Sequence, residues 1–408
     1  MPRILILMSD TGGGHRAAAN ALSKAIQRLD HEHRFTVDTV DFITETAFPP
    51  FHHFGKLYRP SIDHAAWFYG LAFKVTSPLP VKSALNAVVA SIAGPKMLQM
   101  LRRHPFDLIV SVHPLATSVP GRLLRQLRPN LPFVTVVTDL ATAHPFWFWR
   151  GATRTFVASD EAQRRAVAAG VPAERVERSG LPIDLRFLSL PTDKAQMKRE
   201  YGLPIDRPMV LLVGGGEGMG GLDKLAGAIA DSGLPLSQMV IAGRNERLRR
   251  KLTERQWKIP TVVTGFVRDM PRRMAAADLL ITKAGPGTLA EGLATRLPIF
   301  ITSFIPGQEE GNVRWITESG VGRLTPSPDE VSIALRGLFN EHGPTILHQR
   351  ACDAAATLAA PRAALDIAAR LIEMADLPPA TTNFDSSREK RGRWRVWGNR
   401  RKQIDRPP

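Results

Sequence analysis

The sequence has little cysteine, a deficit of acidic residues and no apolar run long enough to cross a bilayer. A single cysteine among 408 residues excludes a disulfide framework within the chain and fits a reducing compartment. The apolar run at residues 4–8 is too short for a signal peptide. The longest mainly apolar stretch, 84–94, is well short of the roughly 20 residues that a membrane helix needs. We therefore expect no signal peptide and no transmembrane helix.

Basic residues outnumber acidic ones by 54 to 38, which gives a net charge of +16. Such a charge attracts an acidic partner, such as anionic lipid, a phosphate-rich ligand or nucleic acid. Arginines and lysines are dense in residues 379–408, where they surround Trp394 and Trp397. We expect this segment to be a disordered tail, and its pattern suits either anionic lipid or RNA.

Two similar openings, each a strand followed by a glycine-rich turn and a helix, lie about 200 residues apart. The first begins with residues 4–8, and the second begins with residues 209–213. Strands alternate with helices after both, which predicts an α/β fold with parallel sheets and two Rossmann-like domains. We expect an N-terminal domain at 1–185, a C-terminal domain at 186–378 and the tail at 379–408.

The first glycine-rich turn, SDTGGGHR at residues 9–16, places Gly14 and His15 where a helix begins. Glycines allow close backbone approach to a ligand, and a helix N-terminus attracts negative charge. His15 suits a general base at neutral pH, and it equally suits a helix cap without a catalytic role. Asp30 and Asp38 keep a dinucleotide site open as an alternative.

Two further motifs follow strands of the first domain, SVHPL at 111–115 and TDLATAHPFWF at 138–148. They bring His113 and Asp139 to the sheet edge of His15, so Asp139 is either a rival base or a group that orients His15. Trp147 and Phe148, together with Trp67, predict an aromatic surface that enters lipid headgroups. Ordinary core packing is the alternative for these rings.

Three polar, glycine-containing turns follow strands of the second domain, at 214–221, 282–291 and 305–312. Glycines and helix N-termini there predict a diphosphate site, and the turns lack the Lys-Ser/Thr pair of an ATPase loop. Glu291 can accept hydrogen bonds from ribose, whereas Gln308 and Glu309 can bind sugar hydroxyls. No metal-ligand spacing occurs, so we expect no tightly held metal. The other residues assigned to the donor site are Gly214, Gly215, Gly216, Lys283, Gly285, Gly287 and Thr288.

Together these motifs, with the SALNAVVASIAG segment at 83–94, resemble the monogalactosyldiacylglycerol synthase family in content and order. The resemblance implies a GT-B fold in which two Rossmann-like domains face a cleft. It also implies an inverting, metal-independent transfer of a hexose from a UDP-sugar to the sn-3 hydroxyl of 1,2-diacylglycerol. The first domain then binds the acceptor and the membrane, and the second binds the UDP-sugar.

The resemblance also suggests roles for single residues. His15 is similar to the family's proposed base, and Phe266 lies in the segment similar to the uracil site. Trp147 resembles a residue linked to an anionic lipid activator, such as phosphatidylglycerol. The remaining assignments are Gly287 and Thr288 to the diphosphate, Glu291 to ribose, and Gln308 and Glu309 to the sugar hydroxyls.

The motifs GGGHR, SVHPL and HPFWF are closer to the galactosyl branch than to the glucosyl one. UDP-galactose is therefore the preferred donor, with UDP-glucose as the alternative. A transferase acting on a polyprenyl-linked glycan and a non-enzymatic sensing or RNA-binding protein are the other hypotheses. We expect a peripheral protein on the cytoplasmic face of a membrane, without cofactor or nucleic acid, and the sequence does not specify an oligomeric state.

Overall fold

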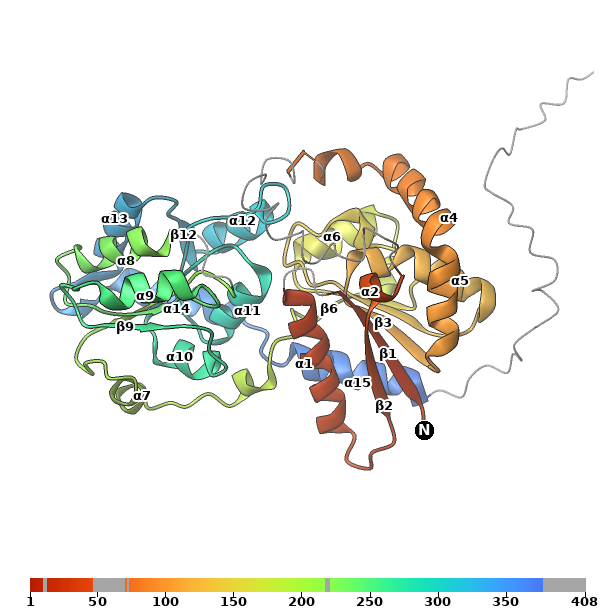
Figure 1. Cartoon of the computed structure of the whole chain (residues 1–408), viewed down its shortest axis with the longest axis horizontal. Coiled ribbons are helices and arrows are strands. Elements are labelled where there is room, and N and C mark those ends of the chain that lie inside the picture. The colour runs from red at the N-terminus through yellow and green to blue at the C-terminus, as the bar shows by residue number, and fades with distance from the viewer. Residues whose placement is uncertain (10–12, 47–69, 72, 217–220, 377–408) are drawn as a thin grey trace, which may run out of the picture.

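The computed structural model describes residues 1–9, 13–46, 70–71, 73–216 and 221–376 of the chain. Two α/β units lie side by side, each built on a six-stranded parallel sheet (Figure 1). The α/β prediction with two Rossmann-like units is confirmed. Trp67 and the basic tail at 379–408 lie outside the described residues.

The first sheet has the strand order β2-β1-β3-β4-β5-β6. Its strands are β1 (Arg3–Met8), β2 (Thr36–Asp41), β3 (Leu108–Ser111), β4 (Phe133–Val136), β5 (Arg154–Val157) and β6 (Val176–Arg178). Its helices include α1 (Gly14–Leu29), α2 (Phe42–Thr46), α4 (Leu79–Arg103), α5 (Ser118–Leu127) and α6 (Asp160–Ala168). The order changes direction between β1 and β3, and ligands of such sheets bind at the carboxyl ends of the strands beside this switch point.

The second sheet has the strand order β12-β11-β10-β7-β8-β9, with its switch point between β7 and β10. Its strands are β7 (Met209–Val213), β8 (Ser237–Ile241), β9 (Thr261–Thr264), β10 (Leu279–Thr282), β11 (Ile299–Ile301) and β12 (Gly322–Leu324). Its helices are α7 (Lys194–Glu200), α8 (Leu222–Ala230), α9 (Glu246–Glu254), α10 (Met270–Ala276), α11 (Pro286–Ala294), α12 (Glu310–Glu318), α13 (Pro328–Leu338) and α14 (Ile346–Leu358). A short ribbon of β13 (Phe339–Asn340) and β14 (Gly343–Pro344) lies between α13 and α14.

The inner strands of both sheets are buried on both faces, which explains why strands such as β1, β3, β7 and β10 read as continuous apolar runs. In β1, Ile4 and Ile6 belong to one core cluster, while Leu5 and Leu7 belong to the cluster on the opposite face. Alternation with a period of two therefore places one strand in two cores. The second sheet repeats this arrangement with its own pair of clusters.

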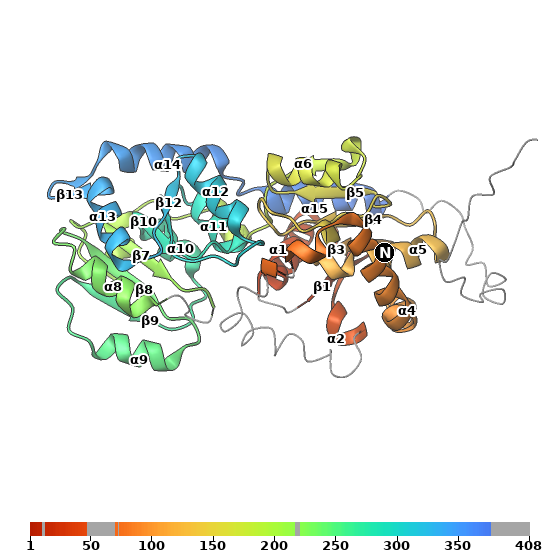
Figure 2. The same cartoon turned by 90° about the horizontal axis from the view of Figure 1, so that it is seen from above.

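The last helix, α15 (Ala363–Asp376), packs against the first sheet and against α1 (Figures 1 and 2). Ile367 and Leu371 join the core cluster of β1, and the alanines Ala21 and Ala25 of α1 lie in the same cluster. Their small side chains permit close helix packing. The predicted domain at 186–378 therefore differs from the structure, because its last helix completes the core of the first unit.

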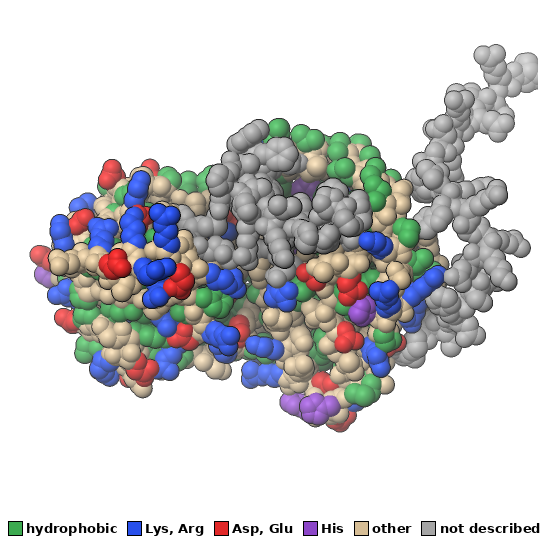
Figure 3. Space-filling view, in the orientation of Figure 1, with side chains coloured by type: hydrophobic (Ala, Val, Ile, Leu, Met, Phe, Trp, Pro, Cys, Tyr) green, Lys and Arg blue, Asp and Glu red, His purple; other side chains and the backbone are tan. Residues whose placement is uncertain are grey.

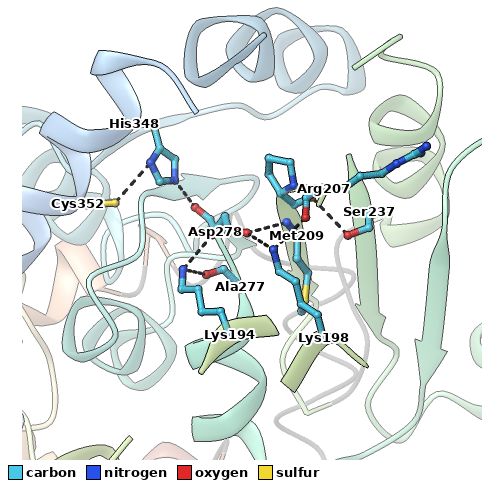
Figure 4. Close-up of polar contacts among 10 residues, drawn as sticks. Lys194, Lys198, Arg207, Met209, Ser237, Ala277, Asp278, His348 and Cys352 are labelled. Atoms are coloured by element: carbon cyan, nitrogen blue, oxygen red, sulfur yellow. Dashed lines mark hydrogen bonds and ion pairs between the residues drawn. The ribbon is translucent and has the colours of Figure 1, made fainter. Parts of the chain in front are cut away.

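Helix α7, which follows the first domain, is fixed to the second sheet through Asp278, the residue directly before β10 (Figure 4). Its carboxylate accepts hydrogen bonds from Lys194 and Lys198 of α7, each at 2.9 Å. Burial opposes ionisation, but these two lysines hold the pKa of Asp278 below its usual value. The Nε2 atom of His348 donates to the Asp278 carbonyl oxygen at 2.7 Å, so α14 is held to the same point.

Helix α4 is unusual because it carries exposed apolar side chains as well as buried ones. Near its C-terminal end, Met97, Met100 and Leu101 are buried in the core of the first unit. In its middle, Val88 and Ile92 are each 53% exposed, and Figure 3 shows hydrophobic side chains gathered over this part of the first unit. By length and composition alone, the helix Pro80–Arg103 is long and apolar enough to cross a membrane, with a mean hydropathy of 1.2 over its most apolar part. The sequence-based expectation of no such helix considered only residues 84–94, which are part of this longer helix.

Candidate functional site

The loops that carry the predicted motifs follow strands beside the two switch points. In the first unit they follow β1, β3 and β4, and in the second they follow β7, β10 and β11. The two sets meet directly: the backbone N–H of Gly311 donates to the hydroxyl of Thr142 at 2.8 Å. The structure therefore brings the predicted first-domain and second-domain motifs to a common boundary between the units.

His15 lies in the first turn of α1 and is held by the loops after β3 and β4. Its Nδ1 atom is 2.9 Å from the carbonyl oxygen of Val112 and 2.9 Å from the hydroxyl of Thr138. A carbonyl oxygen can only accept, so Nδ1 carries a proton and donates it to Val112. In the neutral ring the lone pair is then on Nε2. The backbone of the β3 loop thus fixes the tautomer that a general base needs.

Burial keeps His15 neutral at physiological pH. It lowers the pKa of His15 to about 4, and the hydrogen bond to the Val112 carbonyl opposes this only in part. The ring of His113 packs edge-on at a centroid distance of 4.5 Å. Burial, together with the neighbouring His15, places the pKa of His113 well below its usual value. The two predicted histidines therefore form one neutral pair.

Asp139 is bound to Trp147 and not to His15. Its carboxylate accepts a hydrogen bond from the indole nitrogen of Trp147 at 2.6 Å. Burial raises the pKa of Asp139 to about 6, and hydrogen bonds from Trp147, Gln308 and the backbone of His144 oppose that rise. Among the described residues Val112 and Thr138 contact the Nδ1 atom of His15, so of the two alternatives for Asp139 the structure does not support the one in which it orients this ring directly.

Trp147 and Phe148 do not form the expected lipid-facing surface. Their exposed fractions are 0% and 2%, and both belong to a core cluster with Val137 and Val157. Trp147 lies 5.9 Å from the ring of His15, between centroids, so it forms part of the wall behind this histidine. The expectation of a headgroup-entering surface at these two residues is wrong, because the strand ends β4 and β5 supply an apolar pocket for both rings.

The second unit offers a helix N-terminus of the kind that binds anions. Helix α11 begins at Pro286, and its N-cap is Gly285, which has no side chain to occupy the free N–H groups. A Cβ atom at Gly287 would meet nothing within 4 Å, so the backbone there faces open space. Thr288 lies in the same first turn. The assignment of a diphosphate to this turn stays a prediction.

Lys283 supplies a positive charge next to this turn. Its Cε atom lies 3.4 Å from where Cβ atoms at Gly215 and Gly285 would be, so the side chain lies between the two glycine turns. Gly215 has a φ of 72°, which favours glycine. The Lys283 ammonium is 3.8 Å from the carboxylate of Glu309, a side chain only 4% exposed. The loops after β7, β10 and β11 thus converge on one lysine.

Phe266 presents an exposed aromatic face beside the first of these turns. Its exposed fraction is 55%, and the guanidinium of Arg244 lies 4.7 Å from the ring centroid. The backbone N–H of Arg244 donates to the carbonyl of Gly216 at 2.9 Å, which fixes the phenylalanine near the turn at 214–216. An exposed ring supported by a cation is suited to stacking with a nucleobase.

Glu291 is one turn inside α11 and faces the segment that joins the two units. Burial and the nearby carboxylate of Asp184 raise the pKa of Glu291 to about 7, and Arg186 opposes this rise. Arg186 forms an ion pair with Asp184 at 3.0 Å. Glu291 is therefore a half-buried carboxyl group with acceptor oxygens, as a ribose-binding residue requires.

Gln308 and Glu309 lie at the start of α12, at the boundary between the units. Gln308 is a hydrogen-bond partner of Asp139, so the predicted sugar-binding loop contacts the first unit. Glu309 is 3% exposed, and its carboxylate accepts the backbone N–H of Ile305 at 2.9 Å. This bond braces the loop and leaves the second oxygen toward Lys283.

Sequence reasoning missed three residues that join the units, namely Thr142, Gly311 and Asn312. The side-chain oxygen of Asn312 accepts the backbone N–H of Ala141 at 3.2 Å, and its nitrogen donates to the carbonyl of Ala284 at 3.0 Å. All three lie inside quoted motifs, Thr142 in TDLATAHPFWF and the Gly-Asn pair at the end of IPGQEEGN, but nothing in the sequence marked them as contacts between the units. Within the described ranges, no group of three or more His, Cys, Asp or Glu side chains could hold a metal ion.

The sequence of the chain was compared with those of known protein families. Residues 15–183 match the family model described as monogalactosyldiacylglycerol (MGDG) synthase, and residues 211–319 match the C-terminal domain of glycosyltransferase family 28. A probable monogalactosyldiacylglycerol synthase 2 of Oryza sativa subsp. indica is 38% identical over 393 residues, covering 94% of this chain and 83% of the relative. The chain belongs to the monogalactosyldiacylglycerol synthase family.

Another member of the family, monogalactosyldiacylglycerol synthase 1 of Arabidopsis thaliana, is 39% identical over 339 residues. This match covers 81% of the present chain and 63% of the Arabidopsis protein. The resemblance drawn from the motifs is therefore confirmed. The first family-model match begins at His15 and contains the loops after β3 and β4, and the second contains the loops after β7, β10 and β11.

Solved structures of more distant proteins show the same fold. MurG of Acinetobacter baumannii has a TM-score of 0.57 at 16% identity, covering 91% of this chain and all of that one. HepE of Anabaena, solved in complex with UDP-glucose, has a TM-score of 0.52 at 16% identity, with 91% and 100% covered. The predicted GT-B architecture of this family member is confirmed.

Proposed function

We propose that this protein transfers galactose from UDP-galactose to the sn-3 hydroxyl of 1,2-diacylglycerol. Its membership of a family whose members are named monogalactosyldiacylglycerol synthases supports the donor and the acceptor. The observation that carries the chemistry is the hydrogen bond from Nδ1 of His15 to the Val112 carbonyl, because it leaves a lone pair on Nε2.

The donor lies against the second unit in this proposal. Uracil stacks on Phe266, the ribose hydroxyls bind Glu291, and the diphosphate lies at the N-terminus of α11. Gln308 and Glu309 bind the sugar hydroxyls. Gly214, Gly215 and Gly216 allow the β7 turn to approach the diphosphate, and Lys283 between the turns is within reach of the same charge.

The acceptor hydroxyl binds on the side of the first unit, next to His15 and His113. The Nε2 atom of His15 takes the hydroxyl proton as the oxygen bonds to the anomeric carbon, and the bond from that carbon to the diphosphate breaks. UDP leaves with its electron pair, stabilised by Lys283 and the helix N-terminus. Attack opposite the leaving group inverts the anomeric carbon and gives a β-galactoside.

The low pKa of His15 is that of the protein without a bound UDP-sugar, whose diphosphate is negatively charged. A bound diphosphate places negative charge across the boundary, and negative charge favours the imidazolium form. The pKa of His15 therefore rises toward neutrality when UDP-galactose binds, which improves its match to proton transfer at physiological pH. Asp139, close to Trp147 and Gln308, is the second titratable group proposed on the acceptor side.

We also propose a peripheral position on the cytoplasmic face of a membrane, since diacylglycerol resides in bilayers. The exposed apolar side chains of α4, including Val88 and Ile92, support this position in place of the buried Trp147 and Phe148. An anionic lipid such as phosphatidylglycerol is the proposed activator, in keeping with the net charge of +16.

The stereochemistry of the product tests this mechanism. The full-length protein is incubated with UDP-galactose and diacylglycerol vesicles, and the anomeric proton of the glycolipid is observed by NMR. A β-galactosyl product agrees with direct attack assisted by one base. An α-galactosyl product would contradict the single displacement.

A further inference from the structure

Two hydrogen bonds cross from the donor loops to the loop after β4, and a third lies within the second unit. Gly311 donates its N–H to the hydroxyl of Thr142 at 2.8 Å, and Asn312 accepts the N–H of Ala141 at 3.2 Å. The same Asn312 donates to the carbonyl of Ala284 at 3.0 Å. One side-chain amide therefore joins a backbone group of each unit.

The two partners of Asn312 lie next to functional groups. Ala284 directly precedes Gly285, the N-cap of the proposed diphosphate helix. Ala141 lies in the loop after β4, in which the Thr138 hydroxyl contacts the Nδ1 atom of His15 at 2.9 Å. Asn312 thus connects the proposed diphosphate turn to the loop that supports the proposed base.

The loop after β4 is braced, so a displacement at Ala141 is transmitted along it. The N–H of Ala143 donates to the carbonyl of Ala141 at 2.9 Å, and the hydroxyl of Ser159 donates to the carbonyl of Leu140 at 2.5 Å. Thr142 itself is 6% exposed. A packed loop of this kind moves as a unit.

The contact at Gly311 requires glycine. A Cβ atom at this position would overlap the hydroxyl oxygen of Thr142 and lie 3.1 Å from its backbone nitrogen. Asn312 is 2% exposed, so its amide is shielded from water and both of its polar atoms are used in these bonds. Losing such a side chain leaves two buried backbone groups without their partner.

We infer that Asn312 is a positioning residue that aligns His15 with the donor by holding the diphosphate turn and the β4 loop together. The inference rests on the proposed function. The bonds exist only when the two units are in contact, so Asn312 stabilises the closed cleft. An amide is suited to this role, because it accepts from one unit and donates to the other without adding charge near the diphosphate.

The test compares Asn312→Ala with Ile316→Val, a control in the same helix. Ile316 is fully buried in the core of the second unit, so its truncation lowers Tm without touching the boundary. Thr142→Val and Thr142→Ser form a second pair, since serine keeps the acceptor oxygen for Gly311 and valine removes it. All four variants are studied as full-length protein alongside wild type.

Three quantities are measured, namely kcat for galactosyl transfer, the Kd of UDP by calorimetry, and the radius of gyration with UDP bound by solution scattering. We expect Asn312→Ala to lower kcat by about 10- to 100-fold, the cost of misaligned reacting groups. Its Kd for UDP should stay within about threefold of wild type, and its radius of gyration should increase. Thr142→Ser should retain more activity than Thr142→Val, and Ile316→Val should keep wild-type kcat.

A kcat of Asn312→Ala within twofold of wild type would overturn the inference. So would an equal fall in kcat for Ile316→Val at matched Tm, because the loss would then reflect stability alone. If wild type makes no galactolipid although UDP binds, the proposed function fails. In that case the radius of gyration with UDP bound still tests the inference. Equal radii of gyration for wild type and Asn312→Ala would overturn it.

Discussion

The Nδ1 atom of His15 donates a hydrogen bond to the carbonyl oxygen of Val112 at 2.9 Å, across a separation of 97 residues. The bond joins the first turn of α1 to the loop after β3. It selects the tautomer with a free Nε2 lone pair, and burial keeps the ring neutral with a pKa of about 4. A backbone carbonyl thus has the role that a carboxylate has in many catalytic dyads.

Replacing His15 removes the proposed base while leaving the donor site intact. We expect His15→Gln to lower kcat by about 10²- to 10⁴-fold, the usual contribution of a general base. The Kd of UDP, measured by calorimetry, should be unchanged. His104→Gln is the matched control, because this histidine pairs with Glu45 at the far end of α4. Near-normal turnover in His15→Gln would exclude the base role.

Glu291 should make folding stability depend on pH. Its pKa is raised from 4.5 to about 7 in the folded protein, so the folded state holds a proton that the unfolded state has released between these values. The carboxyl group therefore costs stability as pH rises from 5 to 8, by on the order of 3 kcal/mol.

Glu291→Gln removes that cost, because glutamine does not ionise. The variant should gain Tm relative to wild type at pH 8 and lose this advantage at pH 5, as measured by calorimetric unfolding without ligand. Asp329→Asn, a first-turn carboxylate of α13, is the control. A Tm difference between Glu291→Gln and wild type that is the same at both pH values would show that Glu291 does not titrate in this range.

The exposed ring of Phe266 should account for part of the nucleotide affinity. Stacking of a base on an aromatic side chain contributes about 1–3 kcal/mol, so Phe266→Ala should weaken UDP binding by that amount. Ile333→Ala serves as the control, since Ile333 is 65% exposed on α13. Equal UDP affinity in Phe266→Ala and wild type would remove this ring from the uracil site.

The apolar face of α4 should be needed for vesicle binding. Val88→Glu combined with Ile92→Glu introduces two charges on side chains that are each 53% exposed, so the fold should tolerate them. We expect co-sedimentation with anionic vesicles to weaken about tenfold or more, because apolar burial is replaced by repulsion. Val167→Glu on α6, where Val167 is 42% exposed, should bind like wild type. Equal loss in that control would assign binding to net charge.

The sequence predicted the sheets because their signal is local. Continuous apolar runs identified β1 and β7, which were predicted at 4–8 and 209–213 and are observed at Arg3–Met8 and Met209–Val213. The glycine turns likewise marked the helix N-termini that follow β1 and β10. Such features depend on neighbours along the chain, so no knowledge of tertiary contacts was needed.

The remaining features depend on contacts between distant segments. An amphipathic helix such as α15 carries the same stripe whichever sheet it covers, so periodicity did not reveal its return to the first unit. From the sequence, the rings of Trp147 and Phe148 suited either a membrane surface or a core. The structure shows them buried in a core cluster beside the ends of β4 and β5. The bonds of Asn312 join residues up to 171 positions apart, and no local pattern predicts them.

The most direct test of the account is the initial rate of glycolipid formation by the full-length protein in vesicles of diacylglycerol and phosphatidylglycerol. UDP-galactose and UDP-glucose are supplied in parallel, and a polyprenyl-linked glycan acceptor is the comparison for diacylglycerol. We expect monogalactosyldiacylglycerol from UDP-galactose, at a higher rate than any product from UDP-glucose. Transfer to the polyprenyl acceptor alone, or glucosyl transfer as the faster reaction, would contradict it.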